Sequence, residues 1–148
     1  ISKRVGKNKK VFKMFKLRTM NLETPVINSN DLKDPNKYIT KFGKKLRKYS
    51  IDELPQIINI ILGDMSLVGP RPALENQLDL IKKRDLHSIH TLKPGLTGLA
   101  QINGRDNLTL DRKVEFDNLY LLNQSFLLDV KILFKTIILV FNSKDIKH

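Results

Sequence analysis

Short-range alternation of apolar and polar residues near the N-terminus predicts a β-hairpin. In the stretch KRVGKNKKVFKMFKLRTM, residues 6–9 supply turn residues, and every second position from Val11 to Leu17 alternates imperfectly with its neighbours. The following residues 21–37, NLETPVINSNDLKDPNK, are rich in Asn, Asp and Pro and predict a loop.

Apolar residues spaced three and four apart predict helices along the rest of the chain. Residues 38–49 place Ile39, Phe42 and Leu46 on one face of a basic amphipathic helix. Residues 54–62 are apolar on most sides and predict a largely buried helix that ends at Gly63. Further helices are expected over residues 79–90, 110–122 and 129–141, the last opened by Asp129. Residues 93–105, KPGLTGLAQINGR, predict turns or a tight strand.

Together these elements predict a single α+β domain over residues 1–148, mainly helical and with a small N-terminal β-hairpin. A chain of 148 residues is long enough to bury a core. The longest apolar stretch, residues 132–141, is interrupted by Lys135 and is far shorter than the roughly 20 residues of a membrane-spanning helix. We therefore expect that this chain does not cross a membrane by itself.

The charge balance narrows the possible partners. The chain has 27 Lys and Arg against 15 Asp and Glu, a net charge of +12, which predicts attraction to nucleic acid, an anionic bilayer or phosphorylated substrates. Residues 1–20 carry eight of these cations and no acid, and form either a solvated hairpin face or a surface for membrane or phosphate. The absence of cysteine excludes disulfides and Cys-ligated metals.

Two adjacent acids, Asp52 and Glu53, stand out within the basic sequence KYSIDELP. Residues 50–53 match the S-x-x-E capping box, in which case the acids only begin a helix, although Pro55 moves that beginning to Ile51 or Asp52. The same helix start also offers free amides and partial positive charge to an anion. A carboxylate beside a bound phosphate acts as a nucleophile or a metal ligand. The pattern leaves both interpretations open.

Two arginines accompany the acid pair. Arg47 lies five residues before Asp52, and Arg71 lies between Pro70 and Pro72, whose rings restrict the backbone. A proline-bracketed arginine suits either a bidentate phosphate clamp or the capping of a buried turn. The three histidines show no metal-site spacing beyond an i, i+3 pair, His87 and His90, which we interpret as an exposed surface feature.

Four blocks of the sequence together resemble the bacterial sugar transferases, the monotopic phosphoglycosyl transferases. The blocks are FKLRTM, LRKYSIDELPQIINIILGDMSLVGPRP, LKPGLTGLAQINGR and EFDNLYLLNQSFLLDVKIL, in that order. The resemblance implies transfer of a sugar 1-phosphate from a UDP-sugar to a polyprenol phosphate (undecaprenyl phosphate), with release of UMP, at the cytoplasmic face of the bacterial inner membrane. It also implies a membrane-inserted N-terminal helix, which we expect to be missing from this sequence.

The resemblance also assigns roles to individual residues. It implies that Asp52 is the nucleophile, forms an aspartyl-phosphosugar intermediate and binds Mg²⁺, and that Glu53 is a general base or positions the incoming phosphate. Predicted phosphate or substrate ligands are Arg47, Arg71, Arg105, Lys16 and Arg18. Asp129 matches a family acid near the active site, but an N-cap role is as compatible with its position. Asp117 matches too, although we interpret it as an acid on a helix surface.

Two rival functions fit the charge or the fold. A basic nucleic-acid-binding domain is compatible with +12, but only 7% of the residues are aromatic and no stacking motif is present, so no nucleic acid is expected. A catalytically inactive scaffold with the same fold would not need Asp52, Glu53 and Arg71 together. The sequence pattern does not determine the oligomeric state or the sugar.

Overall fold

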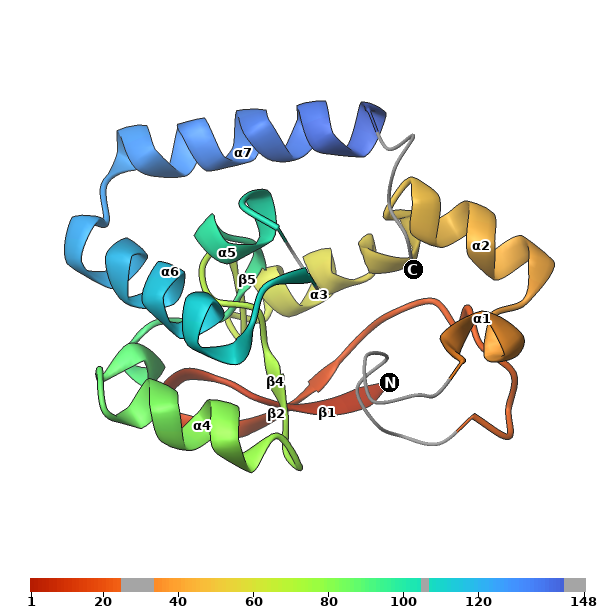
Figure 1. Cartoon of the computed structure of the whole chain (residues 1–148), viewed down its shortest axis with the longest axis horizontal. Helices are drawn as coiled ribbons and strands as arrows, with labels where there is room; N and C mark the ends of the chain where they lie inside the picture. Colours follow the sequence, from red (N-terminus) through yellow and green to blue (C-terminus); the bar gives the residue numbers. More distant parts are fainter. Residues whose placement is uncertain (25–33, 105–106, 143–148) are drawn as a thin grey trace.

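A three-stranded antiparallel sheet forms the N-terminal part of the molecule (Figure 1). The computed structural model describes residues 1–24, 34–104 and 107–142. Strands β1 (Ser2–Val5) and β2 (Val11–Met14) pair with Val5 opposite Val11, and the 3-10 turn η1 (Lys7–Lys9) joins them. The predicted hairpin is confirmed. A short third strand, β4 (Ala73–Leu74), pairs with the other edge of β1.

A second sheet contains two parallel strands, β3 (Ser66–Val68) and β5 (Gly95–Thr97). The tight strand expected within residues 93–105 is confirmed as β5. Its backbone approaches the loop after β3 so closely that a Cβ on Gly95 would lie 2.1 Å from the nitrogen of Gly69. The same segment also contains helix α5 (Leu99–Ile102), which the sequence analysis missed because one turn is too short to show a helical period.

Helices make up most of the remaining chain and confirm the mainly helical α+β prediction. They are α1 (Pro35–Tyr38), α2 (Lys41–Lys48), α3 (Gln56–Ile61), α4 (Leu78–Asp85), α6 (Leu110–Asn123) and α7 (Phe126–Phe141), with 3-10 turns η3 (Ile51–Glu53) and η4 (Ile89–Thr91). Helix α7 lies along the side of the molecule opposite α4 and the three-stranded sheet (Figure 1). The loop predicted for residues 21–37 ends earlier, because α1 begins at Pro35; residues 25–33 lie outside the described residues.

The core joins elements that are distant in the sequence. One buried cluster packs β1, β4, α4, η4 and α6 together through Val5, Ala73, Leu80, Ile89 and Val114. A second cluster packs β3, α6 and α7 through Val68, Tyr120 and Ile132. The loop between β3 and β4, residues 69–72, therefore has both ends anchored in buried clusters.

The helix predicted over residues 38–49 is shorter, because Ile39 is extended and precedes α2. Ile39 and Leu46 are buried as predicted, but Phe42 is not. Phe42 is 69% exposed, whereas Gly43 and Leu46 are buried. The helix begins at Thr40, whose hydroxyl accepts a hydrogen bond from the amide of Gly43. The chain packs so tightly here that a Cβ on Gly43 would lie 2.1 Å from the carbonyl oxygen of Thr19. The glycine therefore decides which face of α2 is buried.

The prediction that residues 54–62 are largely buried is wrong. Asn59 is completely buried and Gln56 nearly so, while Ile61 is 78% exposed. The exposed apolar residues of this segment are Leu54, Ile57, Ile58, Ile61 and Leu62. The physical reason is that the Asn59 amide finds backbone partners inside the protein, so the polar side of α3 faces inward. The expected end of the helix at Gly63 is confirmed, with φ at +84°.

Helix α7 begins earlier than predicted. Ser125 is its N-cap, and its hydroxyl accepts a hydrogen bond from the amide of Leu128. The proposed N-cap role of Asp129 is therefore wrong. Like α3, α7 exposes many apolar side chains, among them Phe126, Leu127, Phe134 and Phe141. None of the helices in the described part of the chain is long and apolar enough to cross a membrane.

Candidate active site

Asp52 and Glu53 lie on η3, the single 3-10 turn between α2 and α3. The capping-box prediction is wrong, because Ser50 has a left-handed backbone with φ at 53° and its side chain caps nothing. The side chain of Asp52 is 1% exposed, and its main-chain oxygen accepts a hydrogen bond from the amide of Leu17 at 2.9 Å. The acid pair is thus joined to the segment that follows β2.

Lys16 forms ion pairs with both acids. Its Nζ lies 3.0 Å from Asp52 Oδ2 and 3.3 Å from Glu53 Oε1. Asn59 fixes the neighbouring backbone, since its Oδ1 accepts a hydrogen bond from the amide of Phe15 and its Nδ2 donates to the carbonyl of Lys13. Sequence reasoning missed Asn59; the only signal was that two amide side chains, Gln56 and Asn59, interrupt an otherwise apolar run.

Arg71 binds the second acid. Its Nη2 lies 3.0 Å from Glu53 Oε1. Burial raises the pKa of Glu53, but the charges and hydrogen bonds of Arg71 and Lys16 outweigh it and lower the pKa to about 2. Glu53 is therefore ionised at neutral pH and holds two cations beside Asp52.

Asp52 itself lacks conventional hydrogen-bond partners. Although the Lys16 ammonium is close, neither carboxylate oxygen of Asp52 accepts an aligned hydrogen bond from the described residues. Leaving a buried carboxylate without donors is unfavourable. Apart from the ion pair of Oδ2 with Lys16, these oxygens thus keep acceptor capacity for a cation or for a bond to phosphorus.

The loop that carries Arg71 is held by two further arginines that sequence reasoning missed. Arg84 Nη1 donates to the carbonyl of Arg71 at 2.9 Å, and Arg4 Nη1 donates to the carbonyl of Pro72 at 3.4 Å. Burial and the nearby charge of Arg71 lower the pKa of Arg4 to about 10. Arg4 lies in a short strand and Arg84 in a helix with several other basic residues. In both patterns a basic residue is usually exposed to solvent, so nothing in the sequence indicates that these two arginines form specific contacts.

Arg84 also forms a buried ion pair with Asp117. Its Nη2 and Nε lie 2.7 and 3.0 Å from Asp117 Oδ2, and both side chains are buried. The interpretation of Asp117 as a surface acid is therefore wrong. Burial raises the pKa of Asp117, and the Arg84 guanidinium offsets part of that rise.

One histidine of the predicted pair is exposed and the other is mostly buried. His87 is exposed as predicted, but the side chain of His90 is only 11% exposed, so the surface interpretation is wrong for His90. Its Nε2 lies 3.3 Å from the carbonyl oxygen of Ile81, and burial lowers its pKa. His148 lies outside the described residues.

The other predicted ligands have contacts of their own in the structure. Arg47 Nε donates to Thr19 Oγ1 at 2.8 Å, Arg18 is exposed, and Asp129 Oδ1 accepts a hydrogen bond from the Tyr120 hydroxyl at 2.7 Å. Arg105 lies outside the described residues. The ion pairs described above bring Lys16, Asp52, Glu53 and Arg71 together.

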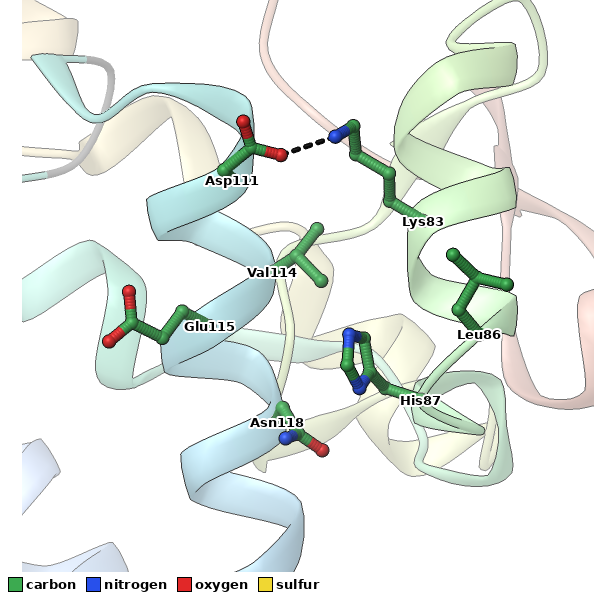
Figure 2. Close-up of a pocket in the computed structure, with 7 residues that line it drawn as sticks. All are labelled: Lys83, Leu86, His87, Asp111, Val114, Glu115 and Asn118. Atoms are coloured by element: carbon green, nitrogen blue, oxygen red, sulfur yellow. Dashed lines mark hydrogen bonds and ion pairs between the residues drawn. The ribbon is translucent and has the colours of Figure 1, made fainter.

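A separate hollow of about 280 Å³ lies between α4 and α6 (Figure 2). Lys83 on α4 pairs with Asp111 on α6 across it, and Glu115 pairs with Arg112 at 2.6 Å. Its other lining residues are Leu86, His87, Val114 and Asn118. None of the predicted site residues lines it, and its acids already pair with cations, so the acid pair on η3 remains the candidate active site.

The profile of the family described as bacterial sugar transferase matches residues 1–143. The chain belongs to the bacterial sugar transferase family. The resemblance inferred from the four sequence blocks is confirmed, and so is the prediction of a sugar transferase enzyme.

Several bacterial relatives are similar over most of this chain. It is 44% identical over 145 residues to an uncharacterized sugar transferase, EpsL, of Bacillus subtilis (strain 168), covering 98% of this chain and 70% of that protein. It is 38% identical over 148 residues to an undecaprenyl-phosphate galactose phosphotransferase of Salmonella typhimurium, covering 90% of this chain. It is 41% identical over 151 residues to a UDP-glucose:undecaprenyl-phosphate glucose-1-phosphate transferase of Klebsiella pneumoniae, covering 95% of this chain. The match spans 31% of the length of each of these last two relatives.

Proposed function

We propose that this protein transfers a sugar 1-phosphate from a UDP-sugar to a polyprenol phosphate, and so starts the assembly of a glycan. The observation that carries the proposal is the buried Asp52 carboxylate, which has no aligned hydrogen-bond donor among the described residues and lies beside Lys16 and the Glu53–Arg71 pair. The names of the relatives from Salmonella typhimurium and Klebsiella pneumoniae, both with undecaprenyl phosphate, support this substrate class.

The proposed reaction has two displacement steps at one phosphorus atom. In the first, a carboxylate oxygen of Asp52 attacks the sugar-bearing phosphorus, the bond to the bridging oxygen breaks, and UMP leaves with that electron pair. In the second, a phosphate oxygen of the polyprenol phosphate attacks the same phosphorus and Asp52 leaves as a carboxylate. Two steps allow a soluble nucleotide to depart before the lipid acceptor arrives. Lys16 and Arg71 neutralise the phosphate charge that such transfers expose.

Glu53 acts in this scheme as a positioning carboxylate. A general base is most effective when its pKa lies near the working pH. The pKa of Glu53, lowered to about 2 by Arg71 and Lys16, is far below that range. Its two contacts instead hold Arg71 and Lys16 at a fixed place beside Asp52.

Magnesium is the cofactor proposed for this site. The oxygens of Asp52 fit it, because Mg²⁺ prefers hard oxygen ligands and no aligned donor in the described part of the chain occupies these two. Among the described residues, no group of three or more His, Asp or Glu side chains surrounds a common metal position. Asp52 is the residue of this site that would hold the ion. A bound Mg²⁺ would supply charge neutralisation at the diphosphate.

We further propose that the domain lies on the cytoplasmic face of the bacterial inner membrane. The exposed apolar side chains of α3 and α7 support a position at a membrane surface, since apolar side chains are unfavourable in water. Exposed lysines on α2, at positions 41, 44, 45 and 48, supply charge that an anionic surface attracts. A polyprenol phosphate acceptor resides in the membrane, so such placement brings the two together.

Release of UMP tests the proposed function. The full-length protein in detergent is incubated with a UDP-sugar, Mg²⁺ and polyprenol phosphate. Asp52→Asn is expected to abolish UMP release, and Glu53→Gln to slow it by about a hundredfold, the usual effect of removing a preorganised charged contact. Asp79→Asn, which changes an exposed acid at the start of α4, is the control and should release UMP at the wild-type rate.

Further outcomes separate the proposal from its rivals. A phosphosugar adduct on Asp52, found by mass spectrometry of the wild type without acceptor, supports the covalent step. A fully active Asp52→Asn variant would defeat the mechanism. A wild type that releases no UMP supports the inactive scaffold, and one that also binds DNA in a salt-dependent manner supports the nucleic-acid-binding domain.

A further inference from the structure

The segment that carries Arg71 is fixed through its carbonyl groups. Pro70 and Pro72 have no amide hydrogen, so they cannot donate to a neighbouring strand. All three carbonyl oxygens of residues 70–72 instead accept hydrogen bonds, from the Gly95 amide, Arg84 Nη1 and Arg4 Nη1 respectively. Three separate elements, β5, α4 and β1, thus determine where the Arg71 backbone lies.

Of the three donors to this segment, Arg84 is itself held in place by a residue of another helix, α6. Its guanidinium uses Nη2 and Nε for Asp117 on α6, and Nη1 for the carbonyl of Arg71. A guanidinium is planar, so the bond to Asp117 sets the direction in which Nη1 points. Figure 2 shows α4 and α6 side by side, and the Val114 side chain between them is part of the core cluster that contains Leu80.

We propose that Arg84 and Asp117 are positioning residues, which hold Arg71 in the place where it meets Glu53 and the substrate phosphate. The inference rests on the proposed function, because it concerns the geometry of that reaction. The connection runs from Asp117 to Arg84, then to the main chain of Arg71, and through its side chain to Glu53. A buried ion pair usually adds little to the stability of a protein, since the cost of desolvating the two charges offsets their attraction. The hydrogen bond from Arg84 to the carbonyl of Arg71 gives this pair a role in placing Arg71.

A local measurement tests this without relying on activity. Hydrogen exchange of the full-length protein, followed by mass spectrometry, is compared between the wild type, Arg84→Lys and Asp117→Asn. We expect exchange in the peptide covering residues 69–77 to become about tenfold faster, while peptides from α3 and α7 keep their wild-type rates. The matched controls are Arg112→Lys and Glu115→Gln, which make the same changes in an exposed pair on α6 and should leave all peptides unchanged.

The exchange data have two contrary outcomes. Wild-type rates at residues 69–77 in both variants would overturn the proposal, because the contact would not be holding the loop. Uniformly faster exchange over the whole chain would also overturn it, because the pair would then support general stability only.

Kinetics of UMP release supply a second test. Arg84→Lys should lower kcat/KM by roughly ten- to a hundredfold, the effect expected when a phosphate ligand is slightly misplaced. In an Arg71→Lys background the same change should cause little further loss, because residues that act through one another are not additive. Equal losses in both backgrounds would overturn the inference.

A double variant separates positioning from folding. Replacing Arg84 by Met and Asp117 by Leu removes both charges together and is expected to keep the fold, as buried ion pairs usually tolerate apolar replacement. Turnover should stay as slow as in Arg84→Lys, since the Arg71 carbonyl has lost its donor; wild-type turnover in this variant would overturn the proposal.

The two tests also separate this inference from the proposed function. If the wild type releases no UMP, the proposed function fails, but the exchange experiment still decides whether Arg84 holds the loop.

Discussion

At the scale of single residues, the charge of Glu53 is set by its neighbours. Burial raises its pKa, and Arg71 and Lys16 together lower it from the ordinary 4.5 to about 2. The folded protein therefore binds this proton less tightly than the unfolded chain does. By linkage, Glu53 contributes stability that is fully present above pH 4.5 and is lost as the pH falls toward 2.

This linkage predicts how stability depends on pH. Between pH 4.5 and 2, the free energy of unfolding of the wild type should fall by up to about 3 kcal/mol more than that of Glu53→Gln. Solvent screening of the half-exposed Arg71 makes the expected difference smaller than this upper value. Urea denaturation at a series of pH values, with a chelator present, measures the difference. Parallel curves for the two proteins would show that Arg71 and Lys16 do not hold the Glu53 carboxylate.

At the scale of elements, Gly43 shows how tertiary contact overrides helix propensity. Alanine in a helix interior is usually about 1 kcal/mol more favourable than glycine. Here the added Cβ would lie 2.1 Å from the Thr19 carbonyl oxygen and 2.8 Å from the Thr40 hydroxyl that caps the helix. The packing term therefore opposes the propensity term and exceeds it.

Gly43→Ala is accordingly expected to destabilise the protein by about 1 to 3 kcal/mol, the range for overpacked sites. Lys44→Ala, on the exposed side of the same helix, is the matched control and should change the stability by less than about 0.5 kcal/mol. Urea denaturation compares the two variants. A more stable Gly43→Ala protein would mean that α2 and the chain segment around Thr19 separate easily.

At the scale of the whole molecule, charge and exposed apolar surface act together. The net charge of +12 attracts the chain to anionic lipid, and this attraction weakens as salt is added. The apolar faces of α3 and α7 would add a contribution that salt does not screen. The proposed membrane position therefore implies two separable components of binding.

Sedimentation with vesicles of anionic and neutral phospholipid measures both components. The 148-residue chain is expected to bind at low salt and to keep part of its affinity at high salt. A double variant with Ile57→Asn and Ile61→Asn should lower the high-salt affinity by at least about tenfold, because it removes exposed apolar side chains of α3. Leu86→Asn, at an exposed leucine after α4, is the control. Complete loss of binding at high salt would contradict an apolar contribution.

Local patterns alone determined several features of this protein. Alternation predicted the hairpin, helical spacing predicted α6, and Gly63 predicted the end of α3, because each depends on neighbours within a few residues. Four motif blocks in order also identified the family, and with it Asp52, Glu53 and Arg71 as candidates. In the structure Lys16 and Arg71 form ion pairs with the acid pair, as expected for these candidate site residues.

Only the tertiary structure decided which faces and which partners these residues have. The apolar spacing of residues 54–62 is the same whether the apolar side faces inward or outward, and the backbone partners of Asn59 decided the matter. Arg84 and Asp117 are 33 positions apart, and Arg4 lies 68 positions from Pro72, so no local period connects them. Helical spacing records how a residue is placed on its own element, whereas burial and pairing depend on the elements that pack against it.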